Sequence, residues 1–184
     1  MKQILLILNL TLVGLLLSTA VCTAQDPEPP ITWKGNGVST FIGQDETNDM
    51  DIDVRIHIDE NGAVTGEVSS EEGSASIKKF YYAEAQTYEW REYQTRAVVI
   101  ILVINEDGDN PLVVLMRGRV LVNRLLYGET LIIRLSSDIE SALDMNDKSA
   151  ILFDPKNLPQ GLSNVIDKAM PIGLFKVEGA MSSE

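Results

Sequence analysis

The sequence has few of the residues on which most site chemistry depends. It contains one histidine and one cysteine among 184 residues, which leaves no set of side chains for a zinc site or a disulfide framework. A Ser–His–Asp triad would have to use His57, and no Gly-x-Ser-x-Gly sequence marks a nucleophilic serine. We therefore expect no enzymatic activity, no catalytic residue, no metal and no cofactor.

Basic residues are also scarce. The chain has 15 Lys and Arg against 27 Asp and Glu, a formal charge of −12. Surfaces that bind nucleic acid need clustered Lys and Arg, so nucleic acid is excluded as a partner. The apolar fraction of 45% and the charged fraction of 23% are typical of one globular domain, and the length leaves room for a targeting segment.

The N-terminus has the pattern of a secretory signal peptide. A short basic start precedes an apolar stretch over residues 4–17, and small residues follow up to Ala24. Cleavage after Ala20, an uncleaved anchor and lipidation of Cys22 stay open as alternatives. No Asn-x-Ser/Thr site lies outside this segment, which favours bacterial export. We expect a secreted or periplasmic protein without a membrane span in the mature chain, divided into a signal peptide (1–24), a Pro-rich linker (25–31) and a domain (32–184).

The chain after the linker has the periodicity of β-strands. Residues 49–59 alternate strictly between apolar and polar side chains, and Asn61-Gly62 then favours a tight hairpin turn. Residues 97–104 are continuously apolar, which is typical of a strand buried on both faces and requires a cover on its outer side. Further strands are predicted at residues 31–42, 63–69, 74–82, 112–116, 120–126, 130–135, 150–153 and 172–181.

Two short helices are predicted near the C-terminus. Ser137 to Glu140 has the form of a capping box, and apolar residues recur at helical spacing between Leu158 and Met170. Pro159 suits the first turn of this second helix. Both helices are candidates for the cover over residues 97–104.

These elements predict a mainly β single domain. The architecture is an antiparallel up-and-down barrel or a sandwich of about eight or nine strands. A Trp on the first strand, a meander and a late helix before the last strand resemble calycin or lipocalin architecture. Lipocalins carry Gly-x-Trp on the first strand, whereas the order here is Trp33-Lys34-Gly35. The resemblance concerns architecture and implies no site residue.

Aromatic and arginine residues supply the candidate ligand site. Six of the 11 aromatic residues fall within residues 80–93, and rings with a polar tip suit the mouth of a pocket. Arg117 and Arg119 share one strand face, where guanidinium groups can hold an anion. The candidate ligand-binding residues are Tyr82, Tyr88, Trp90, Tyr93, Arg117 and Arg119.

Two acidic clusters resemble calcium-binding loops, but each lacks a residue that such a loop requires. Asp49-x-Asp51-x-Asp53 lacks the glycine that an EF-hand turn requires, and its alternation indicates a strand. The cluster from Asn105 to Asp109 has no distal glutamate. We therefore expect no calcium at either cluster.

Three function classes remain. The first is a secreted, non-enzymatic binding protein that holds a small apolar or aromatic ligand in a barrel. The alternative is a structural or protein-interaction domain of the bacterial envelope with a side-chain-filled core, whose partner is another envelope protein. The third is a hydrolase or isomerase that uses carboxylates such as Asp51 and Asp53, for which no sequence signature is present.

The signal-peptide interpretation predicts a mature N-terminus at Gln25. The small residues at positions 22 and 24 fit the requirements of the cleavage site. Mass analysis of the exported protein should show a chain that begins at Gln25. An intact Met1, or a lipid on Cys22, would contradict the prediction.

Overall fold

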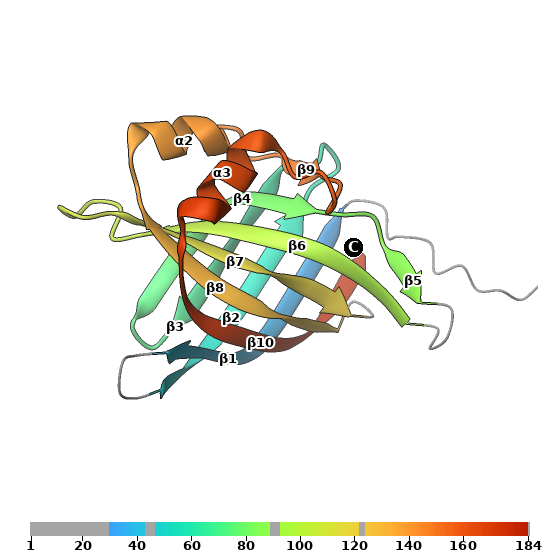
Figure 1. Ribbon diagram of the computed structural model, residues 1–184. Coiled ribbons are helices and arrows are strands. Elements are labelled where there is room, and N and C mark those ends of the chain that lie inside the picture. The colour runs from blue at the N-terminus through green and yellow to red at the C-terminus, as the bar shows by residue number, and fades with distance from the viewer. Residues whose placement is uncertain (1–29, 43–46, 89–92, 122–123, 184) are drawn as a thin grey trace, which may run out of the picture.

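The fold is a closed antiparallel β-barrel, as Figure 1 shows. The computed structural model describes residues 30–42, 47–88, 93–121 and 124–183. The wall follows the order β1-β2-β3-β4-β6-β7-β8-β10, and β10 pairs with β1. The wall strands are β1 (Ile31–Ile42), β2 (Thr47–Ile58), β3 (Val64–Ser70), β4 (Gly73–Tyr82), β6 (Tyr93–Ile104), β7 (Leu112–Leu121), β8 (Leu125–Arg134) and β10 (Met170–Ser183). The barrel prediction is confirmed, and the sandwich is excluded.

Two short strands and two helices lie outside this wall. Strand β5 (Gln86–Tyr88) forms a hairpin with β6, and β9 (Ala150–Leu152) runs parallel to the end of β4. Helices α2 (Ser137–Leu143) and α3 (Gln160–Lys168) confirm the two predicted helices. The N-cap of α2 is Ser136 rather than a residue of the predicted capping box, and Pro159 is the N-cap of α3. No helix in the described part of the chain is long and apolar enough to cross a membrane.

The prediction of three strands within residues 112–135 is wrong. The segment forms two strands, β7 and β8, and the turn lies near Arg124, whose N–H donates to the carbonyl of Leu121 at 3.0 Å. Gly128 lies inside β8, opposite Gly118 of β7. A Cβ atom at Gly118 would lie 2.1 Å from the carbonyl oxygen of Tyr127. These glycines therefore permit the close approach of two strands in the curved wall, and they do not form a turn.

The barrel interior is an apolar core formed by alternate residues of each wall strand. Trp33 fills one end, because Cβ atoms placed at Gly35 and Gly179 would lie 2.7 Å from its indole ring. The buried members of this interior cluster are Trp33, Ile52, Val54, Ile56, Val64, Ala75, Ile77, Phe80, Val98, Ile100, Leu102, Met116, Leu126, Phe175 and Val177.

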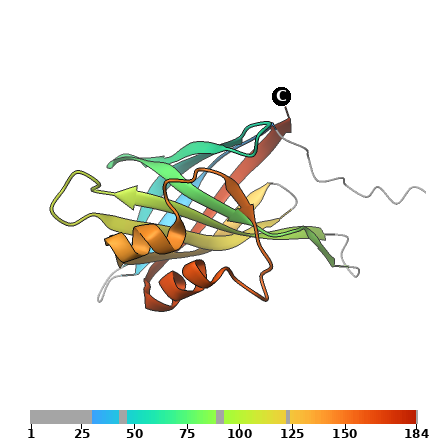
Figure 2. The ribbon, with the colours of Figure 1, turned by 90° about the horizontal axis from the view of Figure 1, so that it is seen from above.

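A second core lies between the outside of the wall and the two helices. Strand β6 contributes to both cores, with Ile100 inside the barrel and Ile101 outside it, each fully buried. Leu143 of α2 and Leu162 of α3 pack into the outer core. Figure 2 shows both helices on the side of the wall that contains β6, β7 and β8. The predicted burial of residues 97–104 on both faces is confirmed, and the helices are the predicted cover.

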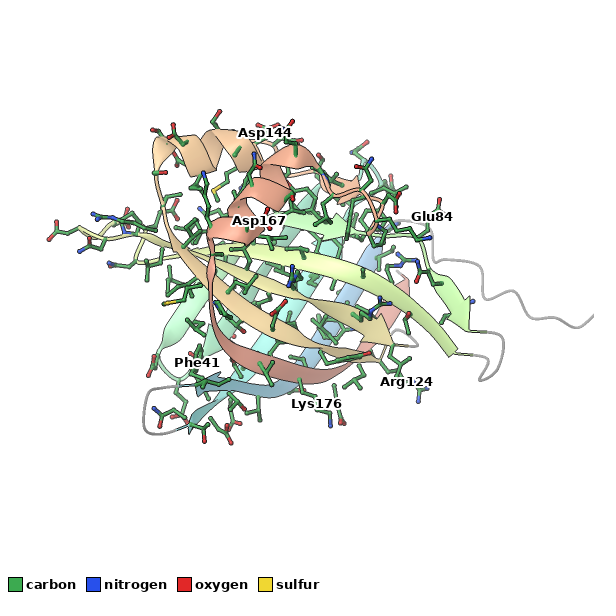
Figure 3. The ribbon with its side chains drawn as sticks, viewed as in Figure 1. Phe41, Glu84, Arg124, Asp144, Asp167 and Lys176 are labelled. Carbon is green, nitrogen blue, oxygen red and sulfur yellow. The ribbon has the colours of Figure 1, made fainter. Side chains whose placement is uncertain are left out.

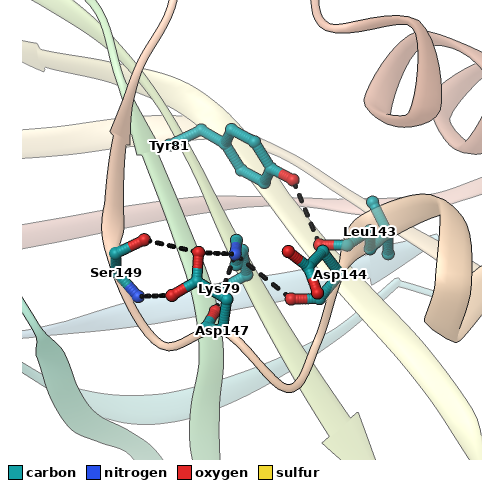
Figure 4. A network of polar contacts seen from close by, with 6 residues as sticks. All are labelled: Lys79, Tyr81, Leu143, Asp144, Asp147 and Ser149. Carbon is teal, nitrogen blue, oxygen red and sulfur yellow. Dashed lines mark hydrogen bonds and ion pairs between the residues drawn. The ribbon is translucent and has the colours of Figure 1, made fainter.

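A β-bulge in β4 places Lys79 beneath α2. The register between β4 and β6 shifts between Ile77 and Lys79, so Lys79 faces the outer core although period two would point it inward. Its ammonium group donates to the carbonyls of Asp144 and Asp147 at 3.1 and 2.6 Å, and contacts the Asp147 carboxylate at 3.2 Å (Figure 4). The Lys79 side chain is fully buried. It donates to carbonyls of the C-cap residue and of the loop that follows α2.

The same network sets two pKa values. Burial raises the pKa of Tyr81 to about 12, with smaller contributions from the charges of Asp144 and Asp147, and its hydroxyl donates to the Leu143 carbonyl at 3.4 Å. The Ser149 hydroxyl and N–H, and then Lys79, donate to the Asp147 carboxylate and lower its pKa to about 2. The loop after α2 is therefore held by charge-assisted hydrogen bonds.

Replacing Lys79 tests whether this network fastens the helices to the barrel. Lys79→Met keeps most of the apolar stem but removes three donors, so it should lower the free energy of unfolding by about 2–4 kcal/mol. The matched control is Lys78→Met, whose exposed pair with Glu106 should contribute about 0–1 kcal/mol. Chemical denaturation measures both, and equal losses would contradict a special role for Lys79.

Alkaline unfolding provides a second test of the same region. An unfolded tyrosine ionises near pH 10, whereas folded Tyr81 holds its proton to about pH 12. Its contribution to stability is therefore complete below pH 10 and is lost as the pH rises toward 12. Denaturation of Tyr81→Phe should show a shallower loss of stability over this range. Tyr127→Phe, at an exposed position, is the matched control, and identical slopes in the wild type and Tyr81→Phe would contradict the assignment.

Candidate functional site

The barrel interior contains a buried hydroxyl that has no partner. Thr130 of β8 lies opposite Met116 of β7, and both face the interior because period two places Thr130 on the same face as Leu126. The residue is 3% exposed, and its Oγ1 atom makes no hydrogen bond within the part of the chain that the structure describes. Nearly all buried polar groups in proteins are hydrogen-bonded, so this atom requires an explanation.

The interior around Thr130 differs from the end that Trp33 fills. Its neighbour on β10 is Gly173, and buried Ser39 of β1 points inward between Phe175 and Met50. Methionine side chains such as Met50 adapt to irregular neighbours more readily than branched residues. Small, polar and adaptable residues therefore lie beside Phe175 in this part of the barrel, whereas Trp33 fills the other end.

The predicted aromatic site is described only in part. Tyr82 packs against the interior cluster, with its ring stacked on Phe80 at 6.1 Å between centroids. The guanidinium of Arg96 lies 5.6 Å from the centre of the Tyr82 ring. Sequence reasoning missed Arg96, although its spacing from Val98 and Ile100 places it on the inward face of β6.

The remaining aromatic candidates flank the end of the β5–β6 hairpin. Tyr88 and Tyr93 are paired in the register of the two strands. Their side chains, and the whole of Trp90, lie outside what the structure describes.

The two arginine candidates lie on the outside of the barrel. Arg117 donates through Nε to Glu129 at 2.6 Å, and Arg119 donates to the Thr95 hydroxyl at 3.3 Å. Tyr82 faces the interior, on the opposite side of the sheet. Arg117 and Arg119 alternate along β7 with the inward Met116, and successive residues of a strand point to opposite faces. The structure thus does not bring them together with Tyr82.

The acidic residues of β2 also point outward. Asp53 accepts a hydrogen bond from the Asn36 amide at 2.7 Å. His57 lies in the same row of outward residues, with its Nδ1 2.9 Å from the Thr32 hydroxyl. Within the residues that the structure describes, no three His, Cys, Asp or Glu side chains are grouped so that they could hold a metal ion.

An open groove of about 480 Å³ crosses the outer face of β1 and β2, a feature that sequence reasoning did not find. The turn between β3 and β4 forms one wall. Its lining residues are Asn36, Gly37, Val38, Asp51, Ile52, Asp53, Ser69, Ser70 and Glu71. The sequence carries no direct signal for this groove, because the groove depends on β3 being shorter than β2.

The molecule therefore offers two candidate sites, the barrel interior at Thr130 and the groove beside β2. A β-barrel fold is consistent with a binding protein, because barrels of this size can enclose one small ligand. Comparison of the chain with protein-family models, curated proteins and solved structures found no match to any of them.

Proposed function

We propose that this protein is an exported, non-enzymatic binding protein that holds one small apolar molecule inside the barrel. The observation that carries the proposal is the buried Thr130 hydroxyl without a partner. A ligand with a single hydrogen-bonding group would satisfy this atom and leave its remaining surface to apolar contacts. The signal-peptide pattern of residues 1–24 supports an extracytoplasmic location.

The energetics of Thr130 favour a binding role over a structural one. A buried hydroxyl without a partner costs about 1–3 kcal/mol, and valine would fill the same shape without this cost. With threonine at position 130, the ligand-free protein is therefore less stable than it would be with valine there. Such losses are characteristic of positions whose side chains serve binding.

The composition of the interior indicates where the ligand lies. Trp33 fills space that a ligand would need at its end of the barrel. The region of Ser39, Met50 and Thr130 has smaller or more adaptable side chains, and we place the ligand there. The two polar side chains would orient it, and the methionine would adjust to its shape.

A second candidate function is a protein-interaction domain of the envelope. The open groove on the outside of β1 and β2 favours it. The two functions use opposite faces of the wall, and the second requires no ligand in the barrel.

Replacement of Thr130 tests the binding function. N-phenyl-1-naphthylamine is a neutral apolar fluorescent probe with one N–H group, so it can donate to the threonine oxygen. Thr130→Val should weaken its binding about fivefold to tenfold, the effect of one hydrogen bond. The same change should raise the melting temperature of the ligand-free protein by about 2–4 °C, because the unsatisfied atom is gone.

Thr130→Ser is the matched control, since it keeps the hydroxyl and should keep most of the probe affinity. The combination of higher stability and weaker binding in Thr130→Val is specific to a binding hydroxyl. A protein that binds no probe, or that binds it equally with threonine and valine, would contradict the proposal and favour the side-chain-filled alternative.

A further inference from the structure

Strand β2 extends beyond one of its two neighbours. Strand β1 pairs with β2 along its whole length, as far as Thr47. On the other side, β3 pairs with β2 only from Ile58 to Asp53, where Asp53 lies opposite Ser69. The Thr47–Ile52 stretch therefore has backbone N–H and C=O groups on its β3 side with no strand partner among the described residues.

A tight turn causes β3 to leave β2 at this point. Ser70 and Gly73 form the last pair between β3 and β4, and Gly73 has a φ of +145°. The Ser70 hydroxyl accepts from the N–H of Glu72 at 3.2 Å. The chain then returns along β4, and the groove opens between this turn and the outer face of β1 and β2.

The side chains beside this edge are acidic. Asp49, Asp51 and Asp53 all point outward because they alternate along β2, and Asp49 and Asp51 are exposed and form no ion pair with another described residue. Two basic side chains of the adjoining rows are already engaged with acidic partners. Arg55 pairs with Glu67 at 3.8 Å, and Lys176 with Glu178 at 2.9 Å.

We infer that the Thr47–Ile52 edge of β2 binds an extended segment of a partner protein that carries Lys or Arg at alternate positions. The segment pairs its backbone with the edge and so continues the sheet. Period two places its alternate side chains on the outer face, where the basic ones lie directly beside Asp49 and Asp51. Glu71, on the wall of the groove, adds negative charge at one end of the site.

Charge complementarity excludes the other occupants that the chain itself could supply. A second copy paired edge to edge would bring one acidic row beside another, and like charges on facing strands are destabilising. Residues 25–30 are a poor strand for this site, because they contain three prolines without N–H groups and two acidic residues. The acidic row therefore disfavours pairing with an acidic strand and favours pairing with a basic strand, which gives the site its specificity.

Peptide binding to the full mature protein tests the inference. The probe is a fluorescent peptide of about eight residues in which Lys and Thr alternate, long enough to cover the edge. A peptide in which Glu replaces every Lys is the charge control. We expect binding of the Lys peptide alone, with an affinity that falls as salt is added.

Backbone methylation separates strand pairing from simple charge attraction. Two further Lys peptides carry N-methyl groups on alternate residues, one set on the odd and the other on the even positions. A peptide added to a strand edge tolerates methyl groups on its outer edge and not on its paired edge, so one peptide should bind and the other should fail. Equal binding of the two would overturn the inference, since charge attraction alone does not distinguish them.

Charge reversal on the protein locates the site. Asp51→Lys should weaken the Lys peptide about tenfold. Asp167→Lys is the matched control, because Asp167 is exposed on α3, which covers the wall far from β2 (Figure 3). It changes the net charge equally and should leave affinity nearly unchanged. Equal losses in the two variants, or a wild-type protein that dimerises through this edge in sedimentation, would overturn the inference.

Discussion

Burial of β6 on both faces is the constraint on which the rest of the structure depends. Its residues alternate between two apolar cores, with Ile100 in the barrel and Ile101 beneath the helices. A strand this apolar is an aggregation hazard unless both faces and both edges are covered. Closure of the barrel covers one face and both edges, and α2 and α3 cover the other face. Lys79 links the two parts, since it comes from the wall and binds the end of α2.

The sequence predicted the features that depend on local periodicity. Alternation in residues 49–59, the apolar run at 97–104 and the helical spacing before Pro171 each correspond to an element in the structure. Each of these signals reports which faces of a segment are apolar, and burial of those faces follows from the hydrophobic effect.

The features that the sequence did not predict depend on contacts between distant segments. Gly128 resembles a turn residue in the sequence, and only its pairing with Gly118 shows that it relieves crowding between two strands. The bulge that turns Lys79 outward breaks the period-two rule at one residue. Alternation within each strand does not relate the faces of different strands, so only the closed wall shows that Arg117 and Tyr82 point to opposite sides.

The two candidate sites lie on opposite faces of one wall and involve different physical chemistry. Inside, the buried hydroxyl of Thr130 meets a largely apolar environment, where one hydrogen bond has a large effect. Outside, the edge of β2 offers backbone groups and exposed carboxylates, where affinity depends on strand pairing and salt. Neither site requires a titrating catalytic group or a metal.

The most direct test of a ligand in the barrel is native mass spectrometry of the protein purified from the cells that produce it. Gentle ionisation should show a species heavier than the polypeptide by the mass of one small molecule. That excess mass should disappear when the protein is unfolded before measurement, because the ligand is held without a covalent bond. A bare polypeptide mass under gentle conditions, from protein that has not been exposed to denaturant, would contradict the account.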